Sequence, residues 1–154
     1  MMQKITPALW FDGNAQEAMD FYTSIFKNSE IISVEKYPDE SIDPHFKGMS
    51  GRVINGVFRL DNQEFVCIDG GPQFKFNEAI SFAINCKDQA EIDYFWEKLS
   101  SSPDAEACGW CRDKFGISWQ ILPENMAELM NGEASVKAMM QMKKIDIEGL
   151  KSAK

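Results

Sequence analysis

The sequence predicts an α+β fold made of two copies of one strand–helix–strands unit, followed by a helical tail. Segments 8–26 and 81–99 can be set over one another, and Gln16 then falls on Gln89. Each copy reads as a short apolar strand, a polar turn and an amphipathic helix with apolar residues at helical spacing. After each helix the apolar period changes to the alternation typical of strands, so the two copies predict two related modules.

The first copy continues with three predicted strands after its helix. Residues 29–37 read as a strand, and residues 51–60 and 64–70 read as two more, joined by a turn at 61–63. The stretch Asp12-Gly13-Asn14 suits the start of the helix, with its polar side chains as caps. The first module is therefore predicted as strand, helix and three strands.

The second copy has a clearer cap and a clearer hairpin. Asp88 is positioned to cap its helix, because its carboxylate can accept an amide of the first turn. Residues 105–113 and 117–122 read as antiparallel strands joined through Gly116. An aspartate at the start of this turn and a glycine at its end suit a three-residue turn that closes on a left-handed residue.

We expect one domain over 1–154, with subdivisions that follow the repeat. The first module spans 3–70, a linker spans 71–78, the second module spans 79–123, and a helical tail spans 124–154. The tail is predicted as two or three short helices whose methionines form a packing face.

Composition excludes some partners. The net charge is -8, and an acidic surface repels phosphate backbones, so nucleic acid is not expected as a partner. No apolar run is long enough to cross a membrane, and the N-terminus shows no signal peptide. We therefore expect a cytoplasmic protein whose four cysteines are reduced. The polar loop 37–51 is typical of a lid or of a partly disordered segment.

The motif C-x-x-C occurs at Cys108 and Cys111, the spacing of redox dithiols and zinc sites. Redox dithiols lie at the start of a helix, but here the following residues carry a turn and strand alternation. Residues three apart on a strand point to opposite faces, which argues against a disulfide. A zinc site is also disfavoured, because the chain has a single histidine, His45.

The predicted hairpin places Trp110 opposite Gln120 and Arg112 opposite Ser118. Alternation then separates an apolar face from a mixed face of the hairpin. The apolar face carries Cys111, Trp119 and Ile121, and the mixed face carries Cys108, Trp110, Arg112, Ser118, Gln120 and Leu122. The apolar face is expected to pack on helices, whereas the mixed face either meets water or lines a cavity.

Three stretches carry a resemblance to a known family: WFDGNAQEAMDFY, GGPQFKFNEAISF and CGWCRDKFGISWQILP. Together with the doubled unit, over roughly residues 3–150, they resemble the PhnB-like branch of the vicinal oxygen chelate superfamily. That superfamily includes glyoxalase I, bleomycin-resistance proteins and extradiol dioxygenases, and the branch is often labelled 3-demethylubiquinone-9 3-methyltransferase-like. The resemblance implies two βαβββ modules that form a cup-shaped mixed sheet, with helices outside, a ligand cavity inside and a homodimer.

The resemblance also implies where a metal would bind. In metal-using relatives one ligand comes from the first strand of each module and one from its last strand. The last-strand positions fall at Gln120 and near Cys67 or Asp69, while the first-strand positions fall near Pro7 and near Ile80 or Ser81. Because a divalent ion normally needs two or three charged or imidazole ligands, we expect no metal and no cofactor.

The sequence favours a metal-free small-molecule-binding protein of the glyoxalase/bleomycin-resistance type. Two alternatives stay open: an enzyme of the superfamily, metal-assisted or using Cys108 or Asp69, or a methyltransferase as the branch is labelled; and a dimeric structural protein with a vestigial cavity. Phe74 and Phe76 are expected either at the rim of the cavity or in the core. The candidate ligand-binding residues are Trp10, Cys67, Asp69, Phe74, Cys108, Trp110, Arg112 and Gln120.

Overall fold

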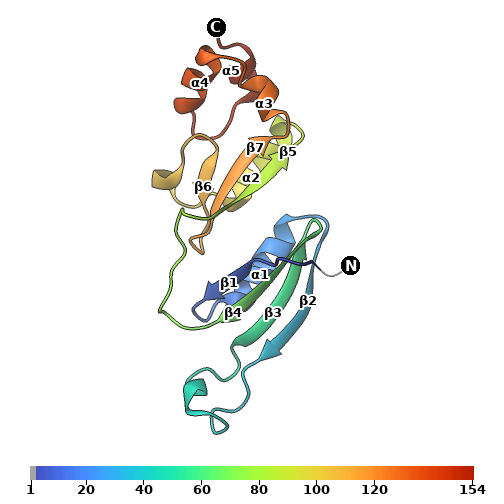
Figure 1. The fold of residues 1–154 in the computed structure, drawn as a ribbon, viewed down its shortest axis with the longest axis vertical. Helices are drawn as coiled ribbons and strands as arrows, with labels where there is room; N and C mark the ends of the chain where they lie inside the picture. Colours follow the sequence, from blue (N-terminus) through green and yellow to red (C-terminus); the bar gives the residue numbers. More distant parts are fainter. Residues whose placement is uncertain (1–2) are drawn as a thin grey trace. The chain divides into compact units, whose positions relative to one another are not determined.

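A computed structural model describes residues 3–154 of the chain. The chain divides into two compact units, and the boundary between Lys75 and Phe76 falls inside the expected linker. Within the described residues, one unit holds a four-stranded sheet and the other a three-stranded sheet, each with a helix of the repeat (Figure 1). The predicted α+β class is confirmed.

The first unit is a mixed sheet with the strand order β1-β4-β3-β2. Strand β1 runs parallel to β4, and the other neighbours are antiparallel. Helix α1 contacts β2, β3 and β4. The elements are β1 (Ala8–Phe11), α1 (Ala15–Ile25), β2 (Ser29–Lys36), β3 (Val53–Leu60) and β4 (Gln63–Asp69).

The turn between β3 and β4 explains the tightness of this hairpin. Asp61 and Asn62 have φ values of 43° and 64°, so both central residues are left-handed. Two left-handed residues define a type I′ turn, whose twist matches that of the flanking strands, and asparagine and aspartate tolerate this conformation well. The turn predicted here from sequence is confirmed.

Helix α1 is capped from a distant strand and not by its own first residues. Asn14 makes no capping side-chain bond. The Oδ1 atom of Asp69, at the end of β4, accepts a 2.9 Å hydrogen bond from the Ala15 amide, and its Oδ2 atom accepts one from the Val53 amide. The prediction of local caps for this helix was therefore wrong, because the free amide at its start is bonded to a carboxylate far along the chain.

The second unit has the strand order β5-β7-β6, with β5 parallel to β7 and β6 antiparallel to it. Helix α2 (Gln89–Leu99) begins after Asp88, whose carboxylate accepts a 2.9 Å bond from the Glu91 amide, so the predicted cap is confirmed. Helix α2 contacts all three strands. The strands are β5 (Ser81–Cys86), β6 (Trp110–Arg112) and β7 (Ser118–Pro123).

Between α2 and β6, the second unit has a short 3-10 helix where the first unit has a full strand. This helix, η2 (Pro103–Ala105), is followed by a single bridge between Ala107 and Trp110. Proline lacks an amide hydrogen and fixes φ, which favours a turn over a paired strand at this place. The second module is thus a shortened form of the first.

The hairpin of β6 and β7 has the predicted register. Trp110 pairs with Gln120, and Arg112 pairs with Ser118. The Gly116 amide donates to the Asp113 carbonyl, and Gly116 has a φ of 93°, as a turn closing on a left-handed glycine requires. The residues of the predicted apolar face are buried.

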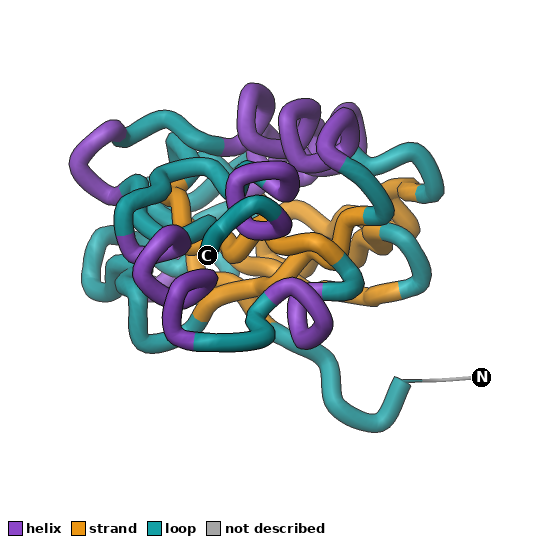
Figure 2. The backbone as a smooth tube through the Cα atoms, turned by 90° about the horizontal axis from the view of Figure 1, so that it is seen from above, coloured by secondary structure: helices purple, strands orange, loops and turns teal. Residues whose placement is uncertain are grey.

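The tail forms three short helices, as predicted (Figures 1 and 2). They are α3 (Met126–Leu129), α4 (Glu133–Met140) and α5 (Ile147–Lys151). Leu129, Ile145 and Leu150 form a buried cluster, against which four tail methionines pack. The predicted packing role is confirmed for these four methionines, whereas Met140, predicted on the same face, is 62% exposed.

The polar loop after β2 is folded on itself. It contains the 3-10 helix η1 (Pro44–Phe46), whose Phe46 ring meets the Tyr37 ring edge-on at 5.5 Å. The Tyr37 amide donates to the Arg52 carbonyl, which closes the base of the loop. Every helix among residues 3–154 is too short or too polar to reach across a lipid bilayer.

Candidate functional site

Each sheet has a buried face toward its helix and a second, partly exposed face, which we call the open face. On the first sheet, Leu9 and Cys67 are buried, and the residues that alternate with them, Trp10 and Ile68, are partly exposed. On the second sheet, Trp110, Gln120 and Leu122 alternate with buried residues in the same way. The open faces carry the candidate site.

Trp10 is held firmly on the open face of the first sheet. Its Nε1 atom donates a 2.9 Å hydrogen bond to the Gly71 carbonyl, and the Phe74 ring meets it edge-on with centroids 4.9 Å apart. A Cβ atom on Gly70 would lie 2.2 Å from the indole ring, so only glycine allows the backbone this close. Phe74 is 64% exposed, and the pair presents an aromatic surface.

Cys67 and Asp69 do not share that surface. Both side chains lie on the buried face, opposite to Trp10, because they pair with Leu9 and Phe11. Burial, together with the nearby Asp69 carboxylate, raises the pKa of the Cys67 thiol to about 12. Asp69 is 2% exposed, and two backbone amides occupy its carboxylate. Both residues were expected on the ligand surface. That expectation was wrong, because strand alternation turns their side chains to the buried face.

The open face of the first sheet instead presents Ile68 at this point. Trp10 pairs with Ile68 in the first module, and Ala83, which aligns with Trp10 in the repeat, pairs with Gln120 in the second. Ile68 and Gln120 are thus equivalent positions. Identifying Ile68 from the sequence would have required the pairing of β1 with β4 as well as alternation along β4.

Gln120 lies between Trp110 and Ser81 on the second sheet. Strand β6 places Trp110 beside it, and the parallel strand β5 brings Ser81 within reach from the other side. The Gln120 Nε2 atom donates a 2.9 Å hydrogen bond to the Ser81 Oγ atom. Gln120, and Ser81 as one of the two residues near the first-strand position that the resemblance implies, are neutral side chains bonded to each other.

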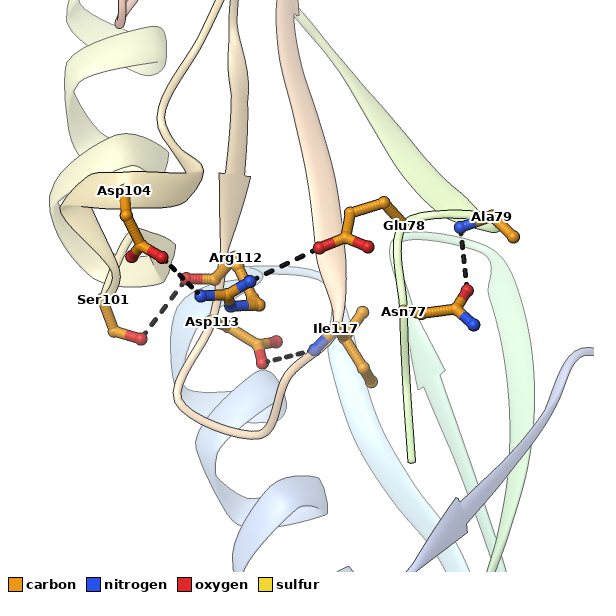
Figure 3. A network of polar contacts seen from close by, with 8 residues as sticks. All are labelled: Asn77, Glu78, Ala79, Ser101, Asp104, Arg112, Asp113 and Ile117. Atoms are coloured by element: carbon orange, nitrogen blue, oxygen red, sulfur yellow. Dashed lines mark hydrogen bonds and ion pairs between the residues drawn. The ribbon is translucent and has the colours of Figure 1, made fainter. Parts of the chain in front are cut away.

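Arg112 is the cation among the candidate residues, and two carboxylates share it. Its Nη1 atom lies 3.4 Å from Glu78, before β5, and its Nη2 atom lies 3.4 Å from Asp104, in η2 (Figure 3). The Ser101 amide donates to the Arg112 carbonyl at 3.0 Å. Because both acids are well exposed, these are weak ion pairs that orient the guanidinium without burying it.

Asp113, next to Arg112, is a structural carboxylate. Its Oδ1 atom accepts bonds from the amides of Phe115 and Ile117, and its Oδ2 atom accepts a 2.8 Å bond from the Trp119 indole. These bonds fix the turn that sets the register of Arg112 and Trp110 (Figure 3). Asp113 therefore helps to position Trp110 and Arg112 on the open face by holding the turn that joins β6 to β7.

Cys108 lies in a turn before β6 and not on the strand where the sequence placed it. Its φ of 52° is left-handed, and its amide donates a 2.8 Å bond to the Met142 carbonyl of the tail. All four cysteines are free thiols. Burial raises the pKa of the Cys111 and Cys86 thiols to about 12, while Cys108 is partly exposed. The contact between the tail and this turn was not predictable from the residues around Cys108.

Among residues 3–154, no three His, Cys, Asp or Glu side chains come together as a metal-binding group. His45 lies in the polar loop, where its Nδ1 atom is 2.7 Å from the Asp43 carboxylate. This pair is exposed and lies outside both sheets. What the open faces offer is aromatic rings, an amide and a guanidinium.

Two strand–helix–strand modules, each with an open sheet face, are the architecture expected from the resemblance to PhnB-like proteins. The chain belongs to the 3-demethylubiquinone-9 3-methyltransferase family, whose model matches residues 3–122.

One solved structure supports this assignment, and two others match with lower identity. A PhnB protein from Bacillus cereus is 40% identical, with 78% of this chain and 99% of that chain covered and a TM-score of 0.65. A protein from Staphylococcus aureus is 33% identical, over 80% and 99% of the two chains, with a TM-score of 0.37. Protein PA1353 from Pseudomonas aeruginosa is 17% identical, over 79% and 98%, with a TM-score of 0.56, a likeness of fold. None of the curated proteins matches the chain.

Proposed function

We propose that this protein binds a small, neutral aromatic molecule on the open face of its second sheet, without a metal ion. Trp110 would supply stacking and apolar contact, and Gln120 and Arg112 would orient the ligand. Aromatic rings provide most of the contact energy in such sites, while a few polar groups fix the orientation.

The hydrogen bond between Gln120 and Ser81 carries the proposal. A divalent ion at this place would need charged or imidazole ligands, but the last strand and the first strand of the second module contribute an amide and a hydroxyl. These two groups satisfy each other, and either can turn toward a ligand that offers a carbonyl or hydroxyl. The donor set fits a neutral organic molecule better than a cation.

The charge around Arg112 supports a neutral ligand. Glu78 and Asp104 both lie close to the guanidinium, so an anionic ligand would have to compete with two carboxylates. The chain as a whole carries a net charge of -8, which repels anions further.

The family name offers a second candidate, a methyltransferase. Binding of a nucleotide-like methyl donor usually relies on a glycine-rich turn after the first strand of a parallel sheet. Here the doublet Gly70-Gly71 follows β4, and both residues are in contact with Trp10. The close approach of the Trp10 indole ring explains why glycines occupy these two positions. We therefore favour ligand binding over methyl transfer as the function.

A thermal-shift screen with neutral aromatic compounds tests the proposal. A compound that binds should raise the melting temperature of the wild type, because it stabilises the folded state by mass action. The shift should be lost in Trp110→Ala and kept in Trp96→Phe, which changes a tryptophan of α2. A screen without any stabilising compound would favour a vestigial surface.

Metal analysis of untagged protein separates the metal enzyme from the binding protein. We expect no stoichiometric divalent metal. Stoichiometric zinc, nickel, manganese or iron that disappears in Gln120→Ala would contradict the metal-free proposal. As a matched variant, Gln120→Glu restores a carboxylate at this position and should raise the affinity for divalent ions above that of the wild type.

A further inference from the structure

The tail lies outside the part of the chain that the family model matches. The family model ends at residue 122, and the Bacillus cereus protein is almost fully covered by 78% of this chain. Within the tail, residues 142–147, which we call the strap, run back to the second sheet before α5 begins. In Figure 1 the tail lies at the end of this sheet where β7 ends and β6 begins.

The strap is bonded to the turn that leads into Trp110. The Cys108 and Gly109 amides donate 2.8 Å hydrogen bonds to the carbonyls of Met142 and Lys143. Gly109 is left-handed at a φ of 88°, and a Cβ atom there would lie 3.0 Å from both Ile145 and Leu122. The strap therefore presses against the start of β6 closely enough to require glycine.

The strap also meets the end of the open face. Leu122 lies on the same face as Gln120, two residues further along β7, and it packs against the buried tail cluster that contains Ile145. Ile145 itself is 0% exposed. The open face of the second sheet thus continues from Trp110 and Gln120 to Leu122 and stops at the tail.

Gln89, at the start of α2, clamps the strap. Its Nε2 atom donates a 2.9 Å bond to the Ile145 carbonyl, and its Oε1 atom accepts a 2.9 Å bond from the Ile147 amide. Lys144 adds a 2.8 Å ion pair with Asp93, one turn along α2. The strap is thus held by polar bonds to α2 and to the turn before β6, and by the burial of Ile145 in the tail cluster.

We propose that the strap is a wall that limits the length of the ligand on the Trp110–Gln120 face, so that releasing the strap by substitution admits a longer ligand. This inference rests on the proposed function of that face. With the strap closed, an aromatic ring fits beside Trp110, but an alkyl chain pointing toward Leu122 meets the tail. With the strap open, the same chain lies along Leu122 and the exposed apolar cluster.

Two variants open the strap, and the repeat provides a matched control. Gln89→Ala removes both bonds of the clamp, and Ile145→Asp places a charge in the buried position under the strap. Gln16 is the equivalent of Gln89 in the first module and makes the same bond to a carboxylate one turn along its helix, to Asp20. Gln16→Ala therefore removes a similar side chain far from the strap in sequence.

Amide hydrogen exchange reports whether the strap opens. The Cys108 and Gly109 amides should exchange faster in Gln89→Ala and Ile145→Asp than in the wild type, and at the wild-type rate in Gln16→Ala. If neither variant accelerates these two amides, the strap is an integral part of the unit and the proposal is overturned.

Binding of 4-ethylphenol and 4-octylphenol tests the effect on ligand length. In the two strap variants, the affinity for 4-octylphenol relative to 4-ethylphenol should rise by about tenfold over the wild-type ratio, the effect of burying about two more methylene groups. Gln16→Ala should keep the wild-type ratio. Adding Trp110→Ala should abolish the gain if the ring binds the open face, whereas a gain that persists would show binding to the exposed tail and would overturn the wall.

The outcomes separate the two levels of the argument. If the wild type binds 4-ethylphenol in a Trp110-dependent way but the strap variants show no gain for 4-octylphenol, the wall fails and the binding function stands. If neither phenol binds any variant through Trp110, the proposed binding of neutral aromatic molecules at this face is contradicted, and so is the proposed role of the strap.

Discussion

The two modules share a repeat but fix their helices and their sheet ends by different means. Helix α1 is capped by Asp69, from the end of a strand far along the chain, whereas α2 is capped by Asp88 directly before it. The first sheet ends on a fourth strand, whereas the second is shorter and is closed by the tail. Duplicated modules can thus keep a topology while exchanging long-range interactions for local ones.

The largest expected effect comes from the long-range cap. Asp69→Ala leaves the Ala15 and Val53 amides without their acceptor in a buried place and should lower the free energy of unfolding by about 3 kcal/mol. Urea denaturation measures the loss, and amide exchange in α1 should show that it falls in the first unit. If Asp69→Ala lowers the free energy of unfolding no more than Asp88→Ala does, the long-range cap is no stronger than the local one.

The seat of Trp10 gives the next effect. Gly70→Ala places a methyl group against the indole and should cost about 2 kcal/mol of stability through overpacking. In a Trp10→Ala background the same substitution should change stability by no more than about 0.5 kcal/mol, because the clash partner is gone. Equal costs in both backgrounds would show that Gly70 is required for a reason other than the ring.

The local cap should cost less. Asp88→Ala removes one side-chain bond to the Glu91 amide, at an exposed helix start, and should lower the free energy of unfolding by about 1 kcal/mol. Asp88→Asn, which keeps an acceptor oxygen, should recover most of this loss. Urea denaturation measures both variants, and an unrecovered loss in Asp88→Asn would point to the charge and not the bond.

The smallest perturbation uses the thiols, without any mutation. Their thiolates react with iodoacetamide, so a raised pKa lowers the reactive fraction at a given pH. Near pH 8, about one unit below the usual thiol value, Cys67, Cys86 and Cys111 should resist alkylation, because their pKa is raised to about 12 and they are buried. The partly exposed Cys108 should be labelled first. Peptide mapping by mass spectrometry checks the order, and early labelling of Cys111 would reopen the dithiol interpretation.

Features that depend on neighbouring residues were predictable from the sequence. The register of the β6–β7 hairpin follows from the turn closed by Gly116, and the cap of α2 follows from Asp88, because both involve residues a few positions apart. The repeat located both helices for the same reason. These local signals were enough for the class of fold and for Trp110, Arg112 and Gln120 on one face.

Features set by distant contacts were not predictable in this way. The role of Asp69 depends on bringing the end of β4 to the start of α1, and the conformation of Cys108 depends on the tail. Cys67 was predicted on the ligand surface from the ligand position that the resemblance implies, whereas the pairing of β1 with β4 places Ile68 beside Trp10. A single sequence does not show which face of a strand packs on the helix unless the position of at least one of its residues is known from another contact.

The bonds between the strap and the turn before Trp110 also bear on the order of events during protein synthesis. The helix cap, the sheet and the contacts of Trp10 in the first unit all come from residues that leave the ribosome before Phe76. The first unit can therefore fold while translation continues. The second unit has to wait, since its left-handed turn at Cys108 and Gly109 is completed by residues translated more than thirty positions later. Until they emerge, Leu122 and the end of β7 stay uncovered, and this interval is when the nascent chain is most open to aggregation and to chaperones.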